Sequence, residues 1–108
     1  MSLDKLRGLL GMCRRSGRLV TGFDAVVALC TTEGVLLMIA TDASPRTAKE
    51  LRFRAAEHPI FRVPLTKEEI AEAVGSHKPV AVLAVADEGF ADALRPLCLS
   101  MQTDEIDA

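Results

Sequence analysis

Two continuous apolar runs constrain the fold of this chain more than any other feature. They are Val35–Thr41 (VLLMIAT) and Val80–Ala86 (VAVLAVA). Runs of this length are typical of strands that are covered on both faces. Such strands need a layer of helices on each side of their sheet, and we expect Val35–Thr41 to lie centrally in it.

The segments around these runs alternate between helical spacing of apolar residues and short extended stretches. We predict helices over 3–15, 23–34, 45–57, 66–75 and 87–97, and strands over 18–21, 35–41, 60–63 and 80–86. Helix and strand therefore alternate from end to end. This order predicts an α/β fold with a four-stranded, mixed but mostly parallel sheet sandwiched between helix layers.

Residues at the predicted helix ends support these boundaries. Ser44 precedes Pro45, which suits an N-cap followed by the first helical position. Thr66 and Glu69 have the spacing of a capping box, and Asp87 can cap the last helix. Glycines are expected to end two of the helices and to open a third, at Gly17, Gly75 and Gly22 respectively.

The length of 108 residues fits one domain, because a second core would leave each half too little apolar surface to bury. We expect residues 1–100 to form this domain and the polar, aperiodic residues 101–108 to form a disordered tail. No apolar run approaches the roughly 20 residues of a membrane-spanning helix, and the N-terminus lacks the layout of a secretion signal. A cytoplasmic location without a membrane partner is expected.

The cysteines and histidines give no sign of a metal or catalytic centre. Cys13, Cys30 and Cys98 are an odd number without a CxxC pair, so we predict buried thiols rather than disulfides or a zinc site. His58 and His77 stand beside loop signals and are expected to be exposed. The chain also lacks the glycine-rich motifs that cradle nucleotide phosphates, so no cofactor is predicted.

Two carboxylates follow the apolar runs, at a place where open α/β sheets often hold ligand groups. Asp42 comes after the first run and Asp87 after the second. Acid–base chemistry by these residues would make the protein a small-molecule enzyme. Helix capping is the simpler interpretation for Asp87, because it stands at a predicted helix start.

Positive charge is concentrated in the first part of the chain. Residues 1–62 carry ten Lys or Arg and six Asp or Glu, whereas residues 63–108 carry three and nine. Two groups of cations stand out: Arg14, Arg15 and Arg18 after the first predicted helix, and Arg46, Lys49 and Arg52 at three-residue spacing in the third. These groups either face phosphate or form solvated surface. The Gly22 turn favours an anion, because a helix N-terminus offers unpaired N–H groups and glycine allows close approach.

Three segments together resemble one known family. They are 9–22 (LLGMCRRSGRLVTG), 39–45 (IATDASP) and 84–91 (AVADEGFA). Their pattern is similar to the bacterial branch of the ribosomal protein L7Ae/L30e superfamily, and the resemblance extends over about residues 3–98. It implies a three-layer α/β/α sandwich that binds kink-turn or related bent RNA without catalysis. It also implies RNA contact by residues 22–25, 41–44 and 76–80.

The start of the second predicted helix departs from the family pattern. Kink-turn binders typically carry Gly-x-Asn-Glu there and a Lys three residues later, whereas this chain has Gly22-Phe23-Asp24-Ala25 and then Ala28. An ionised Asp24 only accepts hydrogen bonds, and alanine side chains offer no polar group. RNA binding is therefore expected with an altered base specificity.

From the residues and the resemblance together, we predict a set of RNA-contacting residues: Arg14, Arg15, Arg18, Gly22, Phe23, Asp24, Asp42, Arg46, His77 and Lys78. The predicted partner is structured RNA, with ribosomal RNA as a candidate, and DNA is not expected. The alternative is a protein-interaction module that kept the fold and lost RNA recognition. That alternative is favoured by the acidic second part of the chain and by an exposed Phe23.

Overall fold

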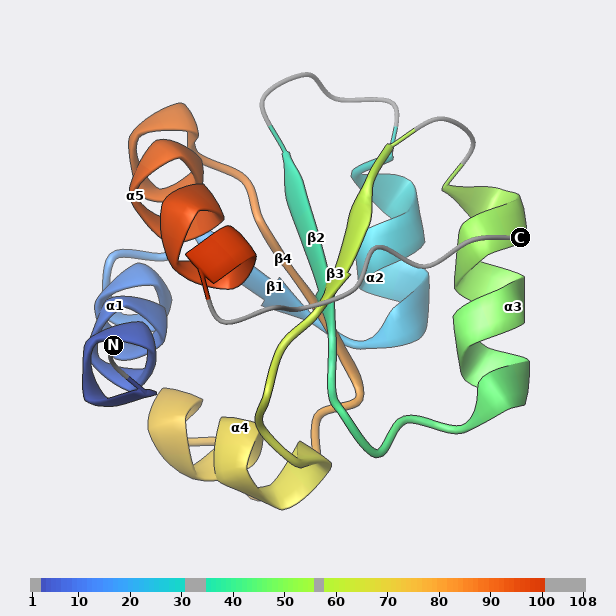
Figure 1. The fold of residues 1–108 in the computed structure, drawn as a ribbon, viewed down its shortest axis with the longest axis horizontal. Helices are drawn as coiled ribbons and strands as arrows, with labels where there is room; N and C mark the ends of the chain where they lie inside the picture. The colour runs from blue at the N-terminus through green and yellow to red at the C-terminus, as the bar shows by residue number, and fades with distance from the viewer. Residues whose placement is uncertain (1–2, 31–34, 56–57, 101–108) are drawn as a thin grey trace.

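The computed structural model describes residues 3–30, 35–55 and 58–100. Helices and strands alternate along these residues in the predicted order (Figure 1). The helices are α1 (Leu3–Arg15), α2 (Phe23–Ala28), α3 (Pro45–Arg54), α4 (Lys67–Val74) and α5 (Glu88–Ser100). The strands are β1 (Leu19–Thr21), β2 (Leu36–Ile39), β3 (Ile60–Arg62) and β4 (Val82–Val85).

The described strands form one sheet in the order β1-β4-β2-β3. β4 runs antiparallel to both of its neighbours, so that Leu83 lies opposite Thr21 of β1 and Met38 of β2. β2 and β3 are parallel, with Leu37 opposite Ile60. The sheet is mixed, but the prediction that it is mostly parallel is wrong. A strand that is buried on both faces reads as a continuous apolar run in either direction, so the sequence pattern did not indicate direction.

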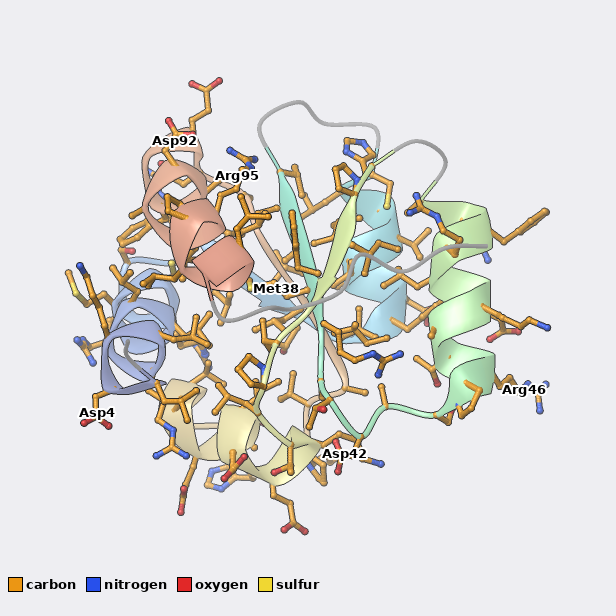
Figure 2. All side chains as sticks on the ribbon, viewed as in Figure 1. Asp4, Met38, Asp42, Arg46, Asp92 and Arg95 are labelled. Carbon is orange, nitrogen blue, oxygen red and sulfur yellow. The ribbon has the colours of Figure 1, made fainter. Side chains whose placement is uncertain are left out.

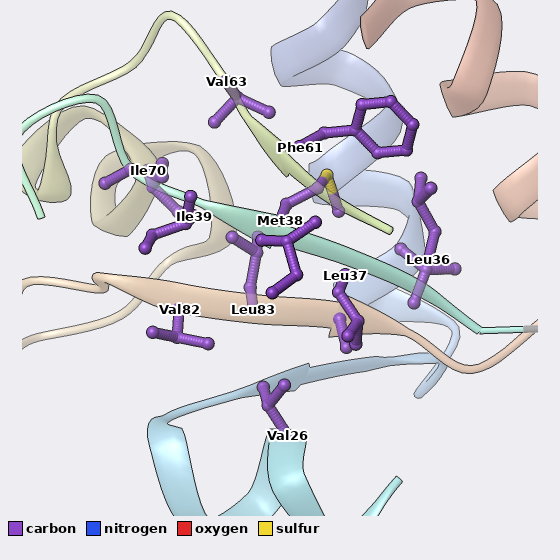
Figure 3. Packing of buried hydrophobic residues seen from close by; sticks show 14 of the residues in the cluster. Val26, Leu36, Leu37, Met38, Ile39, Phe61, Val63, Ile70, Val82 and Leu83 are labelled. Carbon is purple, nitrogen blue, oxygen red and sulfur yellow. The ribbon is translucent and has the colours of Figure 1, made fainter. Parts of the chain in front are cut away.

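The two apolar runs supply the centre of the core. Every residue of β2 and of β4 is buried, and these strands occupy the two inner positions of the sheet. In Figure 1, α1 and α5 lie on one side of the sheet and α2 and α3 on the other, while α4 packs against α1. Figure 3 shows Val26 of α2 on one side of the central strands and Phe61 and Ile70 on the other. The predicted three-layer sandwich is confirmed, and each large apolar side chain buried in it contributes about 1.5–3 kcal/mol.

The predicted helix ends carry the hydrogen bonds that caps require. Ser44 Oγ accepts from the Thr47 N–H at 3.1 Å, ahead of the proline at the first turn of α3. Thr66 and Glu69 form a reciprocal capping box, with N–O distances of 3.1 and 2.9 Å. Gly17, just beyond α1, has a φ of 75°, in the left-handed region that ends helices.

Two helices are shorter than predicted. α2 ends at Ala28, where the Leu29 N–H turns back to the Val26 carbonyl oxygen at 3.0 Å in a tighter turn. α3 ends at Arg54 rather than near residue 57. Residues 31–34, 56–57 and the predicted tail at 101–108 lie outside the described residues. None of the described helices combines the length and hydropathy that crossing a membrane requires.

The histidines and cysteines differ in part from expectation. Cys13 and Cys98 are buried as predicted, whereas Cys30 is half-buried. His58 is half-buried as well, and its Nε2 lies within hydrogen-bonding distance of the Cys30 carbonyl oxygen. The prediction that His58 is exposed is therefore wrong, because a contact far away in sequence covers it. His77 is exposed, as predicted.

Candidate nucleic-acid interface

An open groove of about 420 Å³ lies beside the Gly22 turn, and we call it the Gly22 groove. Its walls come from the junction of β1 and α2, from the first turn of α3 and from the loop that leads into β4. The lining residues are Thr21, Gly22, Phe23, Thr47, Ser76, Lys78, Pro79, Val80, Ala81 and Val82. This lining combines three hydroxyl groups and one cation with apolar side chains, so it suits a ligand that has both anionic and apolar parts, such as a nucleotide.

Gly22 shapes this groove through its backbone. Its φ of 100° and ψ of 146° lie in a region that residues with a Cβ rarely adopt. Its N–H donates to the Val82 carbonyl oxygen at 2.9 Å, and its own carbonyl accepts from the Val26 N–H at 3.0 Å. No atom lies within 4 Å of the position that a Cβ would occupy. The turn is therefore tied to β4 and to α2 while its outer side stays open to a ligand.

A second hollow of about 310 Å³ adjoins the Gly22 groove and adds positive charge. Its lining residues are Arg14, Thr21, Val74, Gly75, Ser76, His77 and Lys78, three of which also line the groove. Among the residues that the structure describes, neither lining contains Asp or Glu. We call the groove and this hollow together the Gly22 edge. The structure thus brings five of the predicted residues together there: Arg14, Gly22, Phe23, His77 and Lys78.

Local hydrogen bonds hold the shape of the loop between α4 and β4. Gly75 ends α4 with a left-handed φ of 73°. Ser76 Oγ donates to the Lys78 carbonyl oxygen at 2.8 Å and accepts from the Lys78 N–H at 3.1 Å. The side chains of His77 and Lys78 are exposed. The backbone of the loop is therefore fixed, and its cation is presented to solvent.

Asp42 lies on the connection between β2 and α3, and Arg46 lies in the first turn of α3, near one end of the molecule (Figure 2). This is also the end at which Gly22 meets β4, because the Ala40 N–H donates to the Ala81 carbonyl oxygen at 2.8 Å. Arg46 is exposed and points away from α3 (Figure 2). Neither residue lines the Gly22 edge, so RNA contact by them stays a prediction. Thr47, which the sequence did not single out, lines the groove from α3.

The structure separates Arg18 from the Gly22 edge. The three residues of β1 lie between Arg18 and Gly22, which at about 3.3 Å per residue amounts to more than about 10 Å. Arg18 Nε instead lies 4.0 Å from Asp87 Oδ1. Arg18 therefore lies outside the Gly22 edge, at the other end of the strand that the sequence predicted over 18–21. RNA contact by Arg18 stays a prediction.

Arg15 and Asp24 are exposed but line neither hollow. Arg15 is in the last turn of α1, and its Nη1 lies over Gly11 of the same helix. Asp24 is in the first turn of α2. RNA contact by these two residues stays a prediction.

Phe23 is half-buried against the core, so the prediction that it is exposed is wrong. It lines the Gly22 groove on one side and, on the other, a separate groove of about 380 Å³ that also involves α3. Packing of α2 beside α3 covers part of the ring, which helical spacing alone did not show. The alternative of a protein-interaction module loses the support of an exposed Phe23.

The two carboxylates that follow the apolar runs lie at opposite ends of the sheet, because β2 and β4 are antiparallel. Asp42 Oδ1 accepts from the Lys67 N–H at 2.8 Å, at the start of α4. Asp87 Oδ2 accepts from the Phe90 N–H at 2.9 Å and caps α5. Two separated carboxylates that each serve a helix start do not form an acid–base pair. The capping interpretation accounts for both residues.

The buried thiols are not poised for chemistry. Burial raises the pKa of Cys13 to about 11, with a smaller contribution from the Asp87 carboxylate. Burial also raises the pKa of Cys98 to about 11, against the opposing effect of Arg95. Because the thiolate is the reactive form, both side chains behave as small apolar groups near neutral pH. Within the described ranges, no three His, Cys, Asp or Glu side chains are grouped to hold a metal ion.

The fold and the groove define a small α/β/α sandwich protein with an open, cation-bordered edge beside a glycine turn. The chain matches the Ribosomal protein L7Ae/L30e/S12e/Gadd45 family over residues 4–95, and it belongs to that family. The resemblance seen in the sequence is thereby confirmed.

Two relatives from bacteria are each named RNA-binding protein YlxQ. The one from Enterococcus faecium is 31% identical over 97 residues, covering 87% of this chain and 91% of the relative. The one from Bacillus subtilis (strain 168) is 32% identical over 91 residues, covering 80% of this chain and 87% of the relative. A solved structure, described as a protein with unknown function from Bacillus halodurans C, matches with a TM-score of 0.76 and 31% identity. It covers 87% of this chain and 96% of its own, which supports the fold over nearly the whole length.

Proposed function

We propose that this protein binds structured RNA through the Gly22 edge and acts by binding rather than by catalysis. The observation that carries the proposal is the lining of the two hollows, in which Arg14 and Lys78 accompany hydroxyl groups and none of the described lining residues carries a carboxylate. Cations attract phosphate, while hydroxyl and backbone groups can donate to phosphate, sugar and base edges. Membership of the family and the names of the two relatives support the same function.

The target that we propose is bent RNA of the kink-turn kind, with ribosomal RNA as the source and the cytoplasm as the location. Gly22 lets a base edge approach the backbone, and the carboxylate of Asp24 can accept from the amino or imino group of a guanine. Ala25 and Ala28 provide no polar group. The loss of one bidentate base contact costs about 1–3 kcal/mol. We therefore expect this protein to distinguish bent RNA from regular RNA less sharply than a kink-turn binder that carries Gly-x-Asn-Glu.

A variant with two cations removed from the Gly22 edge tests this proposal. The wild type and Arg14→Ala/Lys78→Ala are titrated by fluorescence anisotropy against a kink-turn hairpin, fragments of ribosomal RNA and a regular duplex, at several salt concentrations. Each lost phosphate contact reduces the slope of log affinity against log salt by about 1, so the double variant should lose about 2. Binding weakens in parallel for every RNA, because phosphate contacts carry no sequence information.

The matched control is Lys5→Ala/Arg95→Ala, which removes the same charge outside the Gly22 edge. Arg95 is on α5, away from the Gly22 edge (Figure 2). Its Nη1 lies 3.3 Å from Asp92 Oδ1. This control should bind as the wild type does. The proposal fails if the wild type shows no salt-sensitive binding to any of these RNAs, or if both double variants lose the same slope. A nuclease-resistant protein partner that tolerates the Arg14 and Lys78 changes would instead select the protein-interaction alternative.

A further inference from the structure

The outer face of α3 carries an aromatic ring that the fold does not use. Phe53 is 84% exposed, although phenylalanine is among the residues most often found inside proteins. The ring lines the groove of about 380 Å³ between α2 and α3, which we call the Phe53 groove. Its lining residues are Phe23, Lys49, Glu50, Phe53 and Arg54.

The position of Phe53 follows from the helical repeat. Ala48 and Leu51 are the buried residues of α3 and face the core. Phe53 lies about half a turn away from them, on the face that also holds Arg46 and Lys49, seven and four residues before it. Helix formation and core packing therefore do not explain why an aromatic residue stands at this exposed position. A ligand that covers the ring would explain it.

The same helix concentrates positive charge in a chain whose net charge is −2. α3 carries four cations and one carboxylate over its ten residues (PRTAKELRFR). Arg46 stands in the first turn, where the helix dipole disfavours a cation. Arg52 donates to the His58 carbonyl oxygen and so has a structural role. Lys49 and Arg54 line the groove beside the ring, and Arg46 lies about two turns before it on the same face, so the charge along this face suits an anionic partner.

The Phe53 groove is separate from the Gly22 groove but adjoins it. Phe23 lines both, and Thr47 of α3 lines the Gly22 groove two residues before Lys49, the first residue of α3 that lines the Phe53 groove. The axial distance from Thr47 to Phe53 is about 9 Å at 1.5 Å per residue. An RNA strand that leaves the Gly22 groove and runs along α3 reaches the Phe53 ring without crossing the molecule.

We propose that the Phe53 groove binds a single-stranded segment next to the structured RNA, with one base stacked on Phe53 and its phosphates held by Arg46, Lys49 and Arg54. An exposed aromatic ring among cations has the chemistry of single-strand RNA sites, in which stacking and phosphate contacts act together. Glu50 repels phosphate, but its carboxylate can accept from the amino group of a base seated in the groove. This inference rests on the proposed function and extends its site along α3.

The test compares RNAs that differ only in a single-stranded tail. A kink-turn hairpin and ribosomal RNA fragments are each made blunt and with a short adenosine tail. They are titrated against the wild type, Phe53→Ala, Phe53→Leu and Leu99→Ala. Leu99 is on α5 and 60% exposed, so Leu99→Ala is a matched loss of exposed apolar surface away from the groove. Thermal unfolding of each variant checks that the fold is intact.

Phe53→Ala should weaken binding of the tailed RNAs by about 5- to 150-fold, the range for loss of one stacked base, and leave the blunt RNAs unchanged. Phe53→Leu should behave like Phe53→Ala, because leucine has no ring to stack on. Leu99→Ala should bind both as the wild type does. A 2-aminopurine base in the tail should be quenched by the wild type and not by Phe53→Ala.

Failure of this inference is distinct from failure of the proposed function. If the wild type binds the blunt RNAs but Phe53→Ala binds tailed RNA equally well, the stacking site is wrong and the Gly22 edge stands. Full affinity of Phe53→Leu for tailed RNA also overturns stacking. If the wild type binds none of the RNAs, the proposed function and the inference both fall.

Discussion

The Gly22 turn permits a sharp test, because its backbone conformation has a computable cost for any other residue. Gly22→Ala places a Cβ at a φ of 100° and ψ of 146°. No atom lies within 4 Å of that Cβ, so the cost is conformational and no clash is added. Holding a residue in such a region costs about 1–3 kcal/mol. For a domain of this size, we expect the melting temperature to fall by roughly 4–12 °C.

Gly8→Ala is the matched control, since it adds the same methyl group to the chain. Gly8 lies within α1 and is exposed, and no atom lies within 4 Å of its Cβ position. Alanine favours a helix interior over glycine, so this variant should be more stable by about 0.5–1 kcal/mol. The two identical substitutions should therefore shift stability in opposite directions.

The assay is thermal and denaturant unfolding followed by circular dichroism, with RNA binding measured on the same samples. If the backbone relaxes in Gly22→Ala, the hydrogen bond to the Val82 carbonyl oxygen lengthens and RNA affinity falls with stability. Gly8→Ala should leave affinity unchanged. If the Gly22→Ala variant has the same melting temperature and the same RNA affinity as the wild type, the role given to this turn is refuted.

Two further predictions concern stability. Thr66→Ala breaks the capping box of α4 and should cost about 1 kcal/mol, measured by denaturant unfolding, whereas Ser16→Ala at an exposed turn should cost less. The raised pKa of Cys13 and of Cys98 should lower stability in alkali. The unfolded thiols lose their protons near their ordinary value of 9.0, and the folded ones only near about 11. The free energy of unfolding should thus be unaffected by these groups below pH 9 and fall between about 9 and 11. Cys13→Ala/Cys98→Ala should reduce that fall, and an unchanged pH profile in this variant would contradict the assignment.

Most helices and strands could be read from the sequence because their signals are local. The apolar runs, the Ser44 cap, the capping box at Thr66 and the glycine at the end of α4 each depend on residues within about one turn of one another. The helix ends that were predicted too long lacked such signals. α2 has no capping side chain, and it ends where its backbone tightens beside Leu29.

The candidate site could be predicted only in part. Gly22 and Lys78 were identified from the turn and from the resemblance, and the structure brings both into one groove. Ser76 was indicated only as part of the segment 76–80, and Thr47 was missed, because a hydroxyl beside a turn is as common in a cap as in a site. Phe53 was missed because its exposure depends on which side of α3 faces the sheet.

By itself, the sequence determined the order of the elements, the burial of the two apolar strands, the central place of the first of them and the family. Each of these follows from periodicity, capping or motif, which act over short stretches of chain. The tertiary structure alone decided strand direction, because both faces of β2 and β4 are buried whichever way they run. That direction sends Asp42 and Asp87 to opposite ends of the sheet. The composition of the Gly22 edge is therefore a consequence of strand pairing between residues far apart in the chain.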